Sequence, residues 1–128
     1  MNIKKLAVGS LFSMLLVSKM AAAGWGDVYY CQMTEHLGIT PDGEMSKYKL
    51  NKFQFKLDQT KNAMVFGSTG YFADSVVELA IGMNWPSQES WYAKDEFSIT
   101  GFEEGKLLFT SNVVGSGAYF ISADCEKF

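Results

Sequence analysis

The sequence predicts an all-β fold, a single small antiparallel meander that forms a closed or nearly closed barrel of about seven or eight strands. Apolar and polar residues alternate with a period of two through most of the chain after residue 26, which is typical of half-buried strands. Turn residues interrupt the alternation about every eight to twelve residues. No stretch carries the hydrophobic stripe of a helix. A two-sheet sandwich is the alternative architecture.

Residues 1–23 have the three parts of a secretory signal peptide. A basic start is followed by an apolar run over residues 6–17 and by small residues at 21–23. We expect a helical signal peptide that is cleaved after Ala23, leaving a single exported domain at residues 24–128 in the periplasm or outside the cell. A membrane anchor is the alternative, but the apolar run is shorter than the roughly 20 residues that span a bilayer. The cleaved product is not expected to span a membrane.

The charge of the predicted domain excludes one large class of partner. After residue 23 the chain carries eight lysines, no arginine and 14 acidic residues, which gives a net charge of −6. Binding to nucleic acid depends on Lys and Arg that neutralise phosphates, so we expect no nucleic-acid partner. The same charge disfavours anionic lipid surfaces.

The first half of the domain is predicted to contain three strands and one short continuation. Their ranges are 27–34, 47–58, 63–67 and 71–72. A long loop over residues 36–45 should follow the first strand, because Pro41, Asp42 and Gly43 favour a turn. The most regular alternation in the chain is that of Phe53, Phe55 and Leu57 with charged and polar neighbours, which indicates a strand with one buried face.

The second half continues the meander. Residues 76–83 are predicted to be a strand whose apolar face is made by Val77, Leu79, Ile81 and Met83. Residues 89–102 are expected to form a hairpin or one bent strand, with Phe97 and Ile99 pointing inward. The last predicted elements are a tight turn at 103–106, a strand at 106–111, a glycine-rich loop at 113–117 and a strand at 118–125.

The two cysteines are predicted to form a disulfide. Cys31 lies near the start of the exported domain and Cys125 near its end, and a lone pair of cysteines in a small exported domain is usually bonded. In the chain-entropy model, closing a loop of about a hundred residues stabilises the fold by about 4.7 kcal/mol. The bond would place the first and last strands side by side, which favours the closed barrel. A redox pair or a metal site is the alternative, but the chain has no C-x-x-C motif.

No recognisable catalytic site, metal site or cofactor site is predicted. His36 is the only histidine, and we expect it to lie exposed in the loop after the first strand. No serine has the sequence context of a known nucleophile. The acidic pairs at 95–96 and 103–104 could converge, but their spacing does not match a calcium loop. We therefore expect the protein not to be an enzyme.

Aromatic residues mark the candidate binding positions. Trp85, Trp91 and Tyr92 surround a turn that contains Pro86, and amphipathic aromatic side chains are common at binding surfaces. The alternative for Trp91 and Tyr92 is that these neighbours point to opposite faces of one strand, one into the core and one outward. Ser116 and Tyr119, in and after the glycine-rich loop, are further candidates, because loops on a rigid scaffold often carry binding residues.

Two short strings resemble a known family. VYYC at residues 28–31 and GSGAYF at 115–120 are similar to strings in small, disulfide-bonded exported barrels that inhibit lysozyme by inserting a Ser-Gly-Ala loop into its cleft. In this chain the second string comes just before the last strand instead of mid-chain. No basic residue follows its alanine.

The sequence therefore favours a non-catalytic binding module without a cofactor. Its expected partner is another exported or envelope protein. Two alternatives remain: a carrier with a small apolar ligand inside the barrel, and an inhibitor of a secreted enzyme such as lysozyme, which the resemblance implies.

Overall fold

The structure, a computed structural model, describes residues 24–128, which form one antiparallel sheet of nine strands. The predicted signal peptide at residues 1–23 lies outside the described residues. The elements are β1 (Val28–Ile39), β2 (Met45–Lys47), β3 (Lys52–Asp58), β4 (Ala63–Phe66), β5 (Val76–Trp85), the 3-10 turn η1 (Pro86–Gln88), β6 (Ser90–Lys94), β7 (Ser98–Glu103), β8 (Lys106–Val113) and β9 (Gly117–Lys127).

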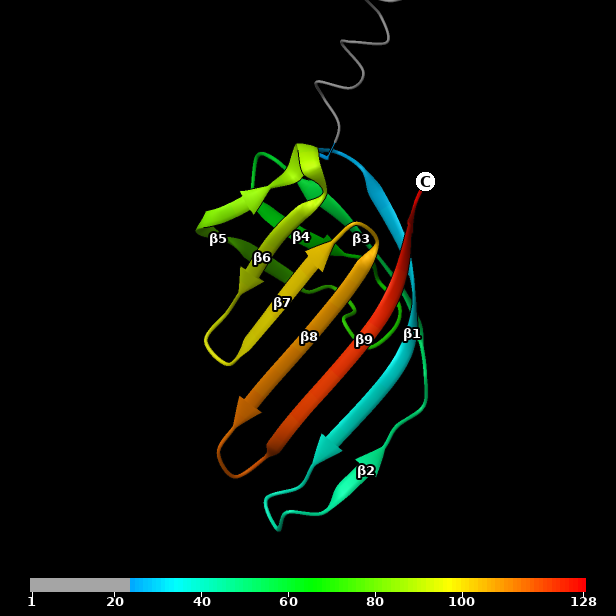
Figure 1. Ribbon diagram of the computed structural model, residues 1–128, viewed down its shortest axis with the longest axis vertical. Helices are drawn as coiled ribbons and strands as arrows, with labels where there is room; N and C mark the ends of the chain where they lie inside the picture. The colour runs from blue at the N-terminus through cyan, green and yellow to red at the C-terminus, as the bar shows by residue number, and fades with distance from the viewer. Residues whose placement is uncertain (1–23) are drawn as a thin grey trace, which may run out of the picture.

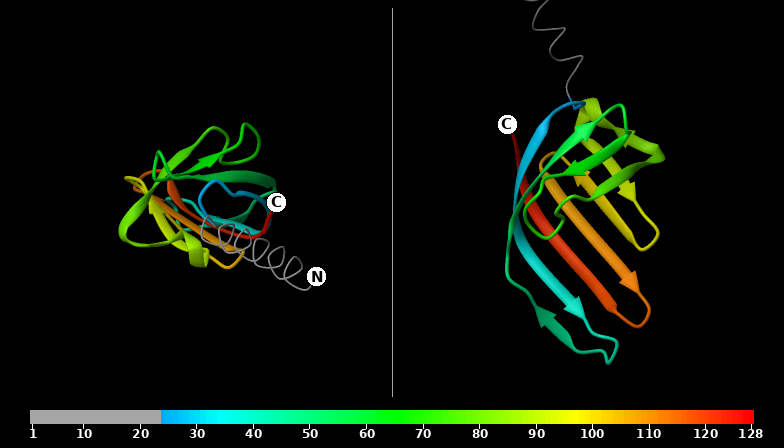
Figure 2. Two further views of the ribbon diagram at one scale, coloured as in Figure 1. Left: turned by 90° about the horizontal axis from the view of Figure 1, so that it is seen from above. Right: turned by 180° about the vertical axis from the view of Figure 1, so that it is seen from behind.

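The sheet closes into a barrel, as the sequence predicted. Its strand order is β2-β1-β3-β4-β5-β6-β7-β8-β9, and β1 also pairs with β9. The eight strands β1 and β3 to β9 thus form a closed antiparallel barrel, with β2 added beside the far end of β1. Strands β6 to β9 make the front wall in Figure 1, and β3 to β5 make the rear wall, which the right-hand view of Figure 2 shows from behind.

Strand β1 is longer than predicted because it has three partners. It pairs with β3 from Val28, with β2 at its end, and with β9 along most of its length. Its register with β9 shifts between Met33 and Glu35, so the inward positions change from odd to even residue numbers there. The predicted loop over 36–45 is therefore wrong in its first part, because the strand continues to Ile39 and only residues 40–44 form the turn.

The predicted disulfide is confirmed and lies at the barrel seam. Cys31 and Cys125 occupy directly opposite positions on β1 and β9 and form a disulfide across 94 residues of sequence. Because β1 and β9 are the ends of the meander, the bond joins the two strands whose pairing closes the barrel. A disulfide is compatible with an oxidising, exported location.

Aromatic rings fill the centre of the barrel. Trp91 stacks on Phe102 with ring centroids 4.2 Å apart, and Tyr29 stacks on Phe55 at 5.0 Å. Tyr29 also contacts Trp91 and Phe102 edge-on. Stacked and edge-on pairs of this kind add about 0.5–1.5 kcal/mol beyond the area they bury. Rings from opposite walls therefore hold the barrel together.

Three sequence predictions are corrected here. Residues 71–72 lie in a turn, although the Phe72 ring is buried. Ile81 is 98% exposed, because the register of β5 and β6 is irregular between Leu79 and Asn84 and the chain leaves the barrel wall there. Phe97 and Ile99 point outward instead of inward, and they are about half exposed.

The direction of Phe97 and Ile99 follows from pairing. Trp91 is fully buried and lies opposite Phe102, so Phe102 must point inward as well. Side chains alternate along a strand, and Ser98 and Thr100 are therefore the other inward residues of β7. Strands β7 and β8 are joined by a two-residue turn at Glu104 and Gly105, where both φ angles are positive. A turn of this type sets the register of the two strands it joins, and that register also has Phe102 pointing inward.

Candidate binding surface

The structure separates the predicted binding residues. Trp85 is exposed at the end of β5, beside η1, whereas Ser116 lies in the β8–β9 turn. Figure 1 places η1 and the β8–β9 turn at opposite ends of the barrel. The prediction of one aromatic patch around Trp85 and Trp91 needs correction, because Trp91 is 0% exposed and belongs to the core. Its neighbour Tyr92 is 45% exposed on the outer face of β6, so the alternative with one ring in and one ring out is confirmed.

Ser116 lies in the turn between β8 and β9, and Tyr119 lies near the start of β9; Figure 1 shows this turn at the lower end of the barrel. The Tyr119 hydroxyl donates a hydrogen bond to the Ser116 carbonyl oxygen at 3.3 Å. The Tyr119 ring is 6.0 Å from that of Tyr48, and both rings lie against Gly38, where an added Cβ would come within 2.6 Å of Tyr48. These rings therefore cover the backbone of β1 from the inner side.

His36 is not an exposed loop residue, and that prediction is wrong. The bulge after Met33 turns its side chain inward, where it is 5% exposed. Its ring lies 4.9 Å from those of both Tyr48 and Tyr71. Within residues 24–128 neither ring nitrogen of His36 has a hydrogen-bond partner. Burial raises the pKa of Tyr71, and the neighbouring Tyr119 and Tyr48 raise it further. The geometry offers His36 no serine or carboxylate to activate.

The largest unexplained feature lies outside the barrel. Along the outer wall, exposed or half-buried apolar side chains gather on neighbouring strands, and we name this surface the outer apolar face. Its members come from β1, β2, β6, β7, β8, β9 and the turn between β6 and β7, and are Leu37, Ile39, Met45, Tyr92, Phe97, Ile99, Leu108 and Phe120. Most of them expose between a third and two thirds of their surface. A soluble barrel normally has polar side chains at these outward positions.

Strand register brings these residues together. Phe120 of β9 lies opposite Leu37 of β1 and Thr110 of β8, and Thr110 lies opposite Ile99 of β7. A second row of opposite residues lies two positions away along β9 and β1. In this row Ala118 lies opposite Ile39, and Ile39 lies opposite Met45. Residues opposite each other in neighbouring strands lie within about 5.5 Å. The outward residues of β7, β8, β9, β1 and β2 therefore form one surface, on which Thr110 of β8 lies between Ile99 and Phe120.

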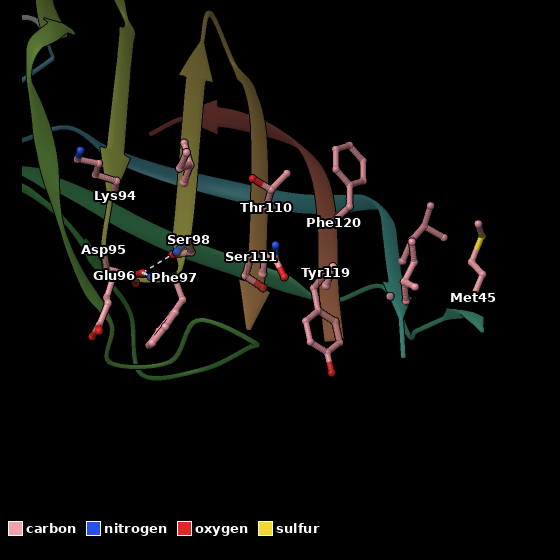
Figure 3. Close-up of a pocket in the computed structure, with 16 residues that line it drawn as sticks. Met45, Lys94, Asp95, Glu96, Phe97, Ser98, Thr110, Ser111, Tyr119 and Phe120 are labelled. Carbon is pink, nitrogen blue, oxygen red and sulfur yellow. Dashed lines mark hydrogen bonds between the residues drawn. The ribbon is translucent and has the colours of Figure 1, made fainter. Parts of the chain in front are cut away.

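Two shallow grooves hollow this face. One has a volume of about 620 Å³ and extends over β7, β8, β9, β1 and β2, and the other has about 610 Å³ and lies over β6, β7 and β8. Ile99 and Thr110 line both grooves. Figure 3 shows how Phe97, Thr110, Phe120 and Met45, which line the first groove, are spread across the hairpin, β8, β9 and β2. The volumes are within the range of ligand sites.

Glycine shapes the second groove. Gly101 on β7 lies opposite Tyr92 on β6, and a Cβ at Gly101 would come within 3.1 Å of the Tyr92 ring. The missing side chain therefore lets the ring lie flat over the neighbouring strand. Flat packing of this kind holds an exposed aromatic ring in place, and such rigid rings make contact area at a low entropy cost.

Charged residues border the grooves. Lys94, Asp95 and Glu96 line the first groove, and Glu103, Glu104 and Lys106 line the second. The Asp95 carboxylate accepts hydrogen bonds from the N–H groups of Phe97 and Ser98, at 2.9 and 2.8 Å. Burial alone would raise the pKa of Asp95, but these hydrogen bonds outweigh it, and the pKa is lowered. Asp95 thus stays ionised while it fixes the turn that carries Phe97.

A polar cluster closes the other end of the barrel. The Tyr29 hydroxyl donates to Glu89 at 3.0 Å, and Glu89 pairs with Lys127 at 3.0 Å. Lys127 also lies 3.7 Å from Asp27. Burial and the hydrogen bond to Glu89 raise the pKa of Tyr29, and Glu89 raises the pKa of Lys127. The cluster joins β1, η1 and the end of β9, and each of its members has a partner.

Neither a metal site nor a helical membrane segment is found in the described part of the chain. Among residues 24–128, no three His, Cys, Asp or Glu side chains gather as metal ligands would. The pairs at 95–96 and 103–104 lie at opposite ends of β7 and do not converge. The same residues include no helix with the length and apolar character needed to cross a bilayer.

Sequence reasoning missed most of the outer apolar face. Only Tyr92 was identified as a candidate binding residue, whereas Phe97 and Ile99 were assigned to the core and the others were given no role. The sequence signal for this face was the segment FSITGF, in which apolar residues occupy both odd and even positions. A strand with this pattern carries apolar side chains on both of its faces. No protein-family model, no curated protein and no solved structure matches this chain.

Proposed function

We propose that this protein is a non-catalytic, exported binding domain, and that the outer apolar face contacts its partner. The observation that carries the proposal is the group of outward aliphatic and aromatic side chains on five neighbouring strands, β7, β8, β9, β1 and β2. Exposed apolar area on this scale marks an interaction site in soluble proteins. Ile99 is 52% exposed and lines both grooves.

The surroundings of His36 support a binding function over catalysis. Catalysis by a histidine needs a partner group within hydrogen-bond reach. His36 instead lies among tyrosine rings at the inner side of β1, away from the grooves.

The packing of the interior supports a surface site over an internal ligand. An eight-stranded barrel has room for at most one small ligand, and here aromatic rings from both walls meet across the centre. Phe55, for example, lies within 6.2 Å of Trp91 and 5.7 Å of Phe102. We therefore assign binding to the outside of the barrel, in the periplasm or outside the cell.

Affinity capture with paired variants tests the proposal. The double variant Ile99→Ser/Phe120→Ser removes two exposed members of the face, and Val76→Ser/Leu50→Ser removes two exposed apolar residues elsewhere as a matched control. We expect the wild type and the control to retain the same envelope or secreted protein, and the face variant to lose it. Hydrogen exchange on the captured complex should then show protection in β7, β8 and β9. Protection confined to the Trp85 end would refute the assignment.

A further inference from the structure

We infer that the outer apolar face binds a cationic chain segment, in which aliphatic or aromatic side chains are flanked on both sides by Lys or Arg. The inference rests on the proposed function and adds the chemistry of the partner. It follows from the charges at the rim of the face, from their positions, and from the charge of the whole domain.

The rim carries an excess of negative charge. Of the six charged residues that line the two grooves, four are acidic. Lys106 is bound to Asp124 at 2.5 Å. By contrast, within residues 24–128 none of the four acidic residues forms a salt bridge. A partner with positive charge would therefore find carboxylates available, while a negatively charged partner would be repelled.

The acidic residues lie at both ends of β7, one of the strands that carry the face. Asp95 and Glu96 precede β7, and Glu103 and Glu104 end it, so the two pairs are separated by a strand of six residues, or roughly 20 Å. Ile99 lies between them and contributes to both grooves. The arrangement matches a segment with a central apolar part and basic residues at each end.

A second copy of this chain fits the face less well. In a two-fold symmetric dimer, the same patch meets itself, so the acidic ends of one copy would face the acidic ends of the other. Each copy also carries a net charge of −6 in residues 24–128. Like charges placed opposite each other at an interface cost affinity, and self-association is therefore expected to be weaker than binding of a cationic segment.

Two synthetic peptides test the inference. Both contain the same central Leu-Ile-Leu-Phe-Leu sequence, and one is flanked by two Lys at each end while the other is flanked by two Glu. We expect the Lys-flanked peptide to bind the oxidised domain at least about tenfold more tightly at low ionic strength, and the difference to shrink at about 0.3 M salt. Titration calorimetry gives both affinities, and sedimentation shows whether the domain self-associates.

Charge-neutral variants locate the effect. Glu96→Gln/Glu104→Gln removes one charge at each end of β7, and we expect it to weaken the Lys-flanked peptide about fivefold. Glu78→Gln/Glu126→Gln removes two charges that line neither groove as the matched control, and it should change affinity by less than about twofold. Equal losses in both variants would mean that only the overall charge attracts the peptide, and would overturn the assignment to the rim.

The outcomes separate this inference from the proposed function. If Ile99→Ser/Phe120→Ser abolishes binding while the Lys-flanked and Glu-flanked peptides bind the wild type equally, the face is a binding site but its preference for a cationic partner is refuted. If neither peptide binds, or if dimers form through the face, the cationic-segment inference is also refuted. The capture experiment then decides the proposed function on its own.

Discussion

The inner and outer faces of β7, β8 and β9 both carry large apolar side chains, but in different surroundings. On the inner side, Phe102, Leu107 and Ile121 are buried against the rear wall of the barrel. On the outer side, Ile99, Leu108 and Phe120 expose between a third and about half of their surface. Folding accounts for the inner set, because burying each such side chain contributes about 1.5–3 kcal/mol. Folding does not explain why the outer residues are apolar, because much of their surface stays exposed in the folded domain.

The contrast with β3 shows that the chain can build a polar outer face. Phe53, Phe55 and Leu57 are buried on its inner side, while the alternate residues Lys52, Gln54 and Lys56 are exposed. Strand β3 thus follows the usual pattern of a half-buried strand with one polar face. The apolar outer residues on β7, β8 and β9 are a local departure from that pattern, and this supports a contact function for them.

The largest expected effect on stability comes from the loss of a core ring. It tests whether the inner and outer faces differ in their contribution to folding. Trp91→Ala removes the ring that stacks on Phe102 and should lower the free energy of unfolding by about 3–5 kcal/mol. Tyr92→Ala, one residue further along on the outer face, should cost less than about 1 kcal/mol. Urea denaturation of both variants measures the difference. Similar losses would mean that the two faces do not differ in their contribution to folding.

Loss of the disulfide has the second-largest expected effect on stability. It tests how far the bond between β1 and β9 stabilises the closed barrel. We expect Cys31→Ser/Cys125→Ser to lower the free energy of unfolding by about 2–5 kcal/mol, because the bond limits the unfolded chain across 94 residues. Reduction of the wild-type protein should lower its melting midpoint to that of the double variant, and should leave the variant unchanged. A wild-type midpoint that does not respond to reducing agent would contradict the closure of β1 on β9 by this bond.

The fold was largely predictable because period-two alternation and the cysteine positions act independently. The strands at Ala63–Phe66 and Lys106–Val113 match their predictions closely, whereas the strand predicted at 47–58 begins only at Lys52, because residues 48–51 connect β2 to β3. Alternation with turn residues indicates antiparallel strands, and the two cysteines indicate which strands meet. The closed barrel follows from the combination, without information about any single side-chain contact.

The binding surface was less predictable, because orientation depends on pairing partners. Within residues 97–102, alternation alone favours Phe97 and Ile99 as inward residues. Pairing of Phe102 with the buried Trp91 reverses that orientation. The bulge after Met33 does the same for His36. A shift of one residue turns every later side chain to the other face, and neither a bulge nor a cross-strand stack can be read from a single segment.

The polar cluster at Tyr29 provides the third prediction, with a smaller effect. Tyr29→Phe keeps the ring in the core but removes the hydrogen bond to Glu89, and we expect a loss of about 1–2 kcal/mol at neutral pH. The raised pKa values of Tyr29 and Lys127 add a pH dependence. Their contribution is complete below the unfolded-state pKa values of about 10, and it is lost as the pH rises through the folded-state values.

Thermal unfolding between pH 8 and about pH 11 checks the direction of that dependence. The wild-type midpoint should fall on the alkaline side, and it should fall less in Tyr29→Phe, which lacks the titrating hydroxyl. Tyr30→Phe, on the exposed side of the same strand, serves as the matched control and should retain the wild-type profile. Parallel curves for wild type and Tyr29→Phe would show that the cluster does not contribute through Tyr29.

The smallest expected change in stability comes from substitutions in the outer apolar face. This change gives the most direct comparison of an outer residue with an inner one. Ile99→Ser exchanges a half-exposed apolar side chain for a polar one, and surface substitutions of this kind alter the free energy of unfolding by about 0.5 kcal/mol or less. Leu107→Ser, on the buried side of the neighbouring strand, should instead cost more than about 2 kcal/mol. The variant Ile99→Ser should also bind less of the hydrophobic dye ANS in its folded state, because the face presents less apolar surface. If Ile99→Ser were as destabilising as Leu107→Ser, the outer residues would be part of the folding core, and their exposure would need no partner to explain it.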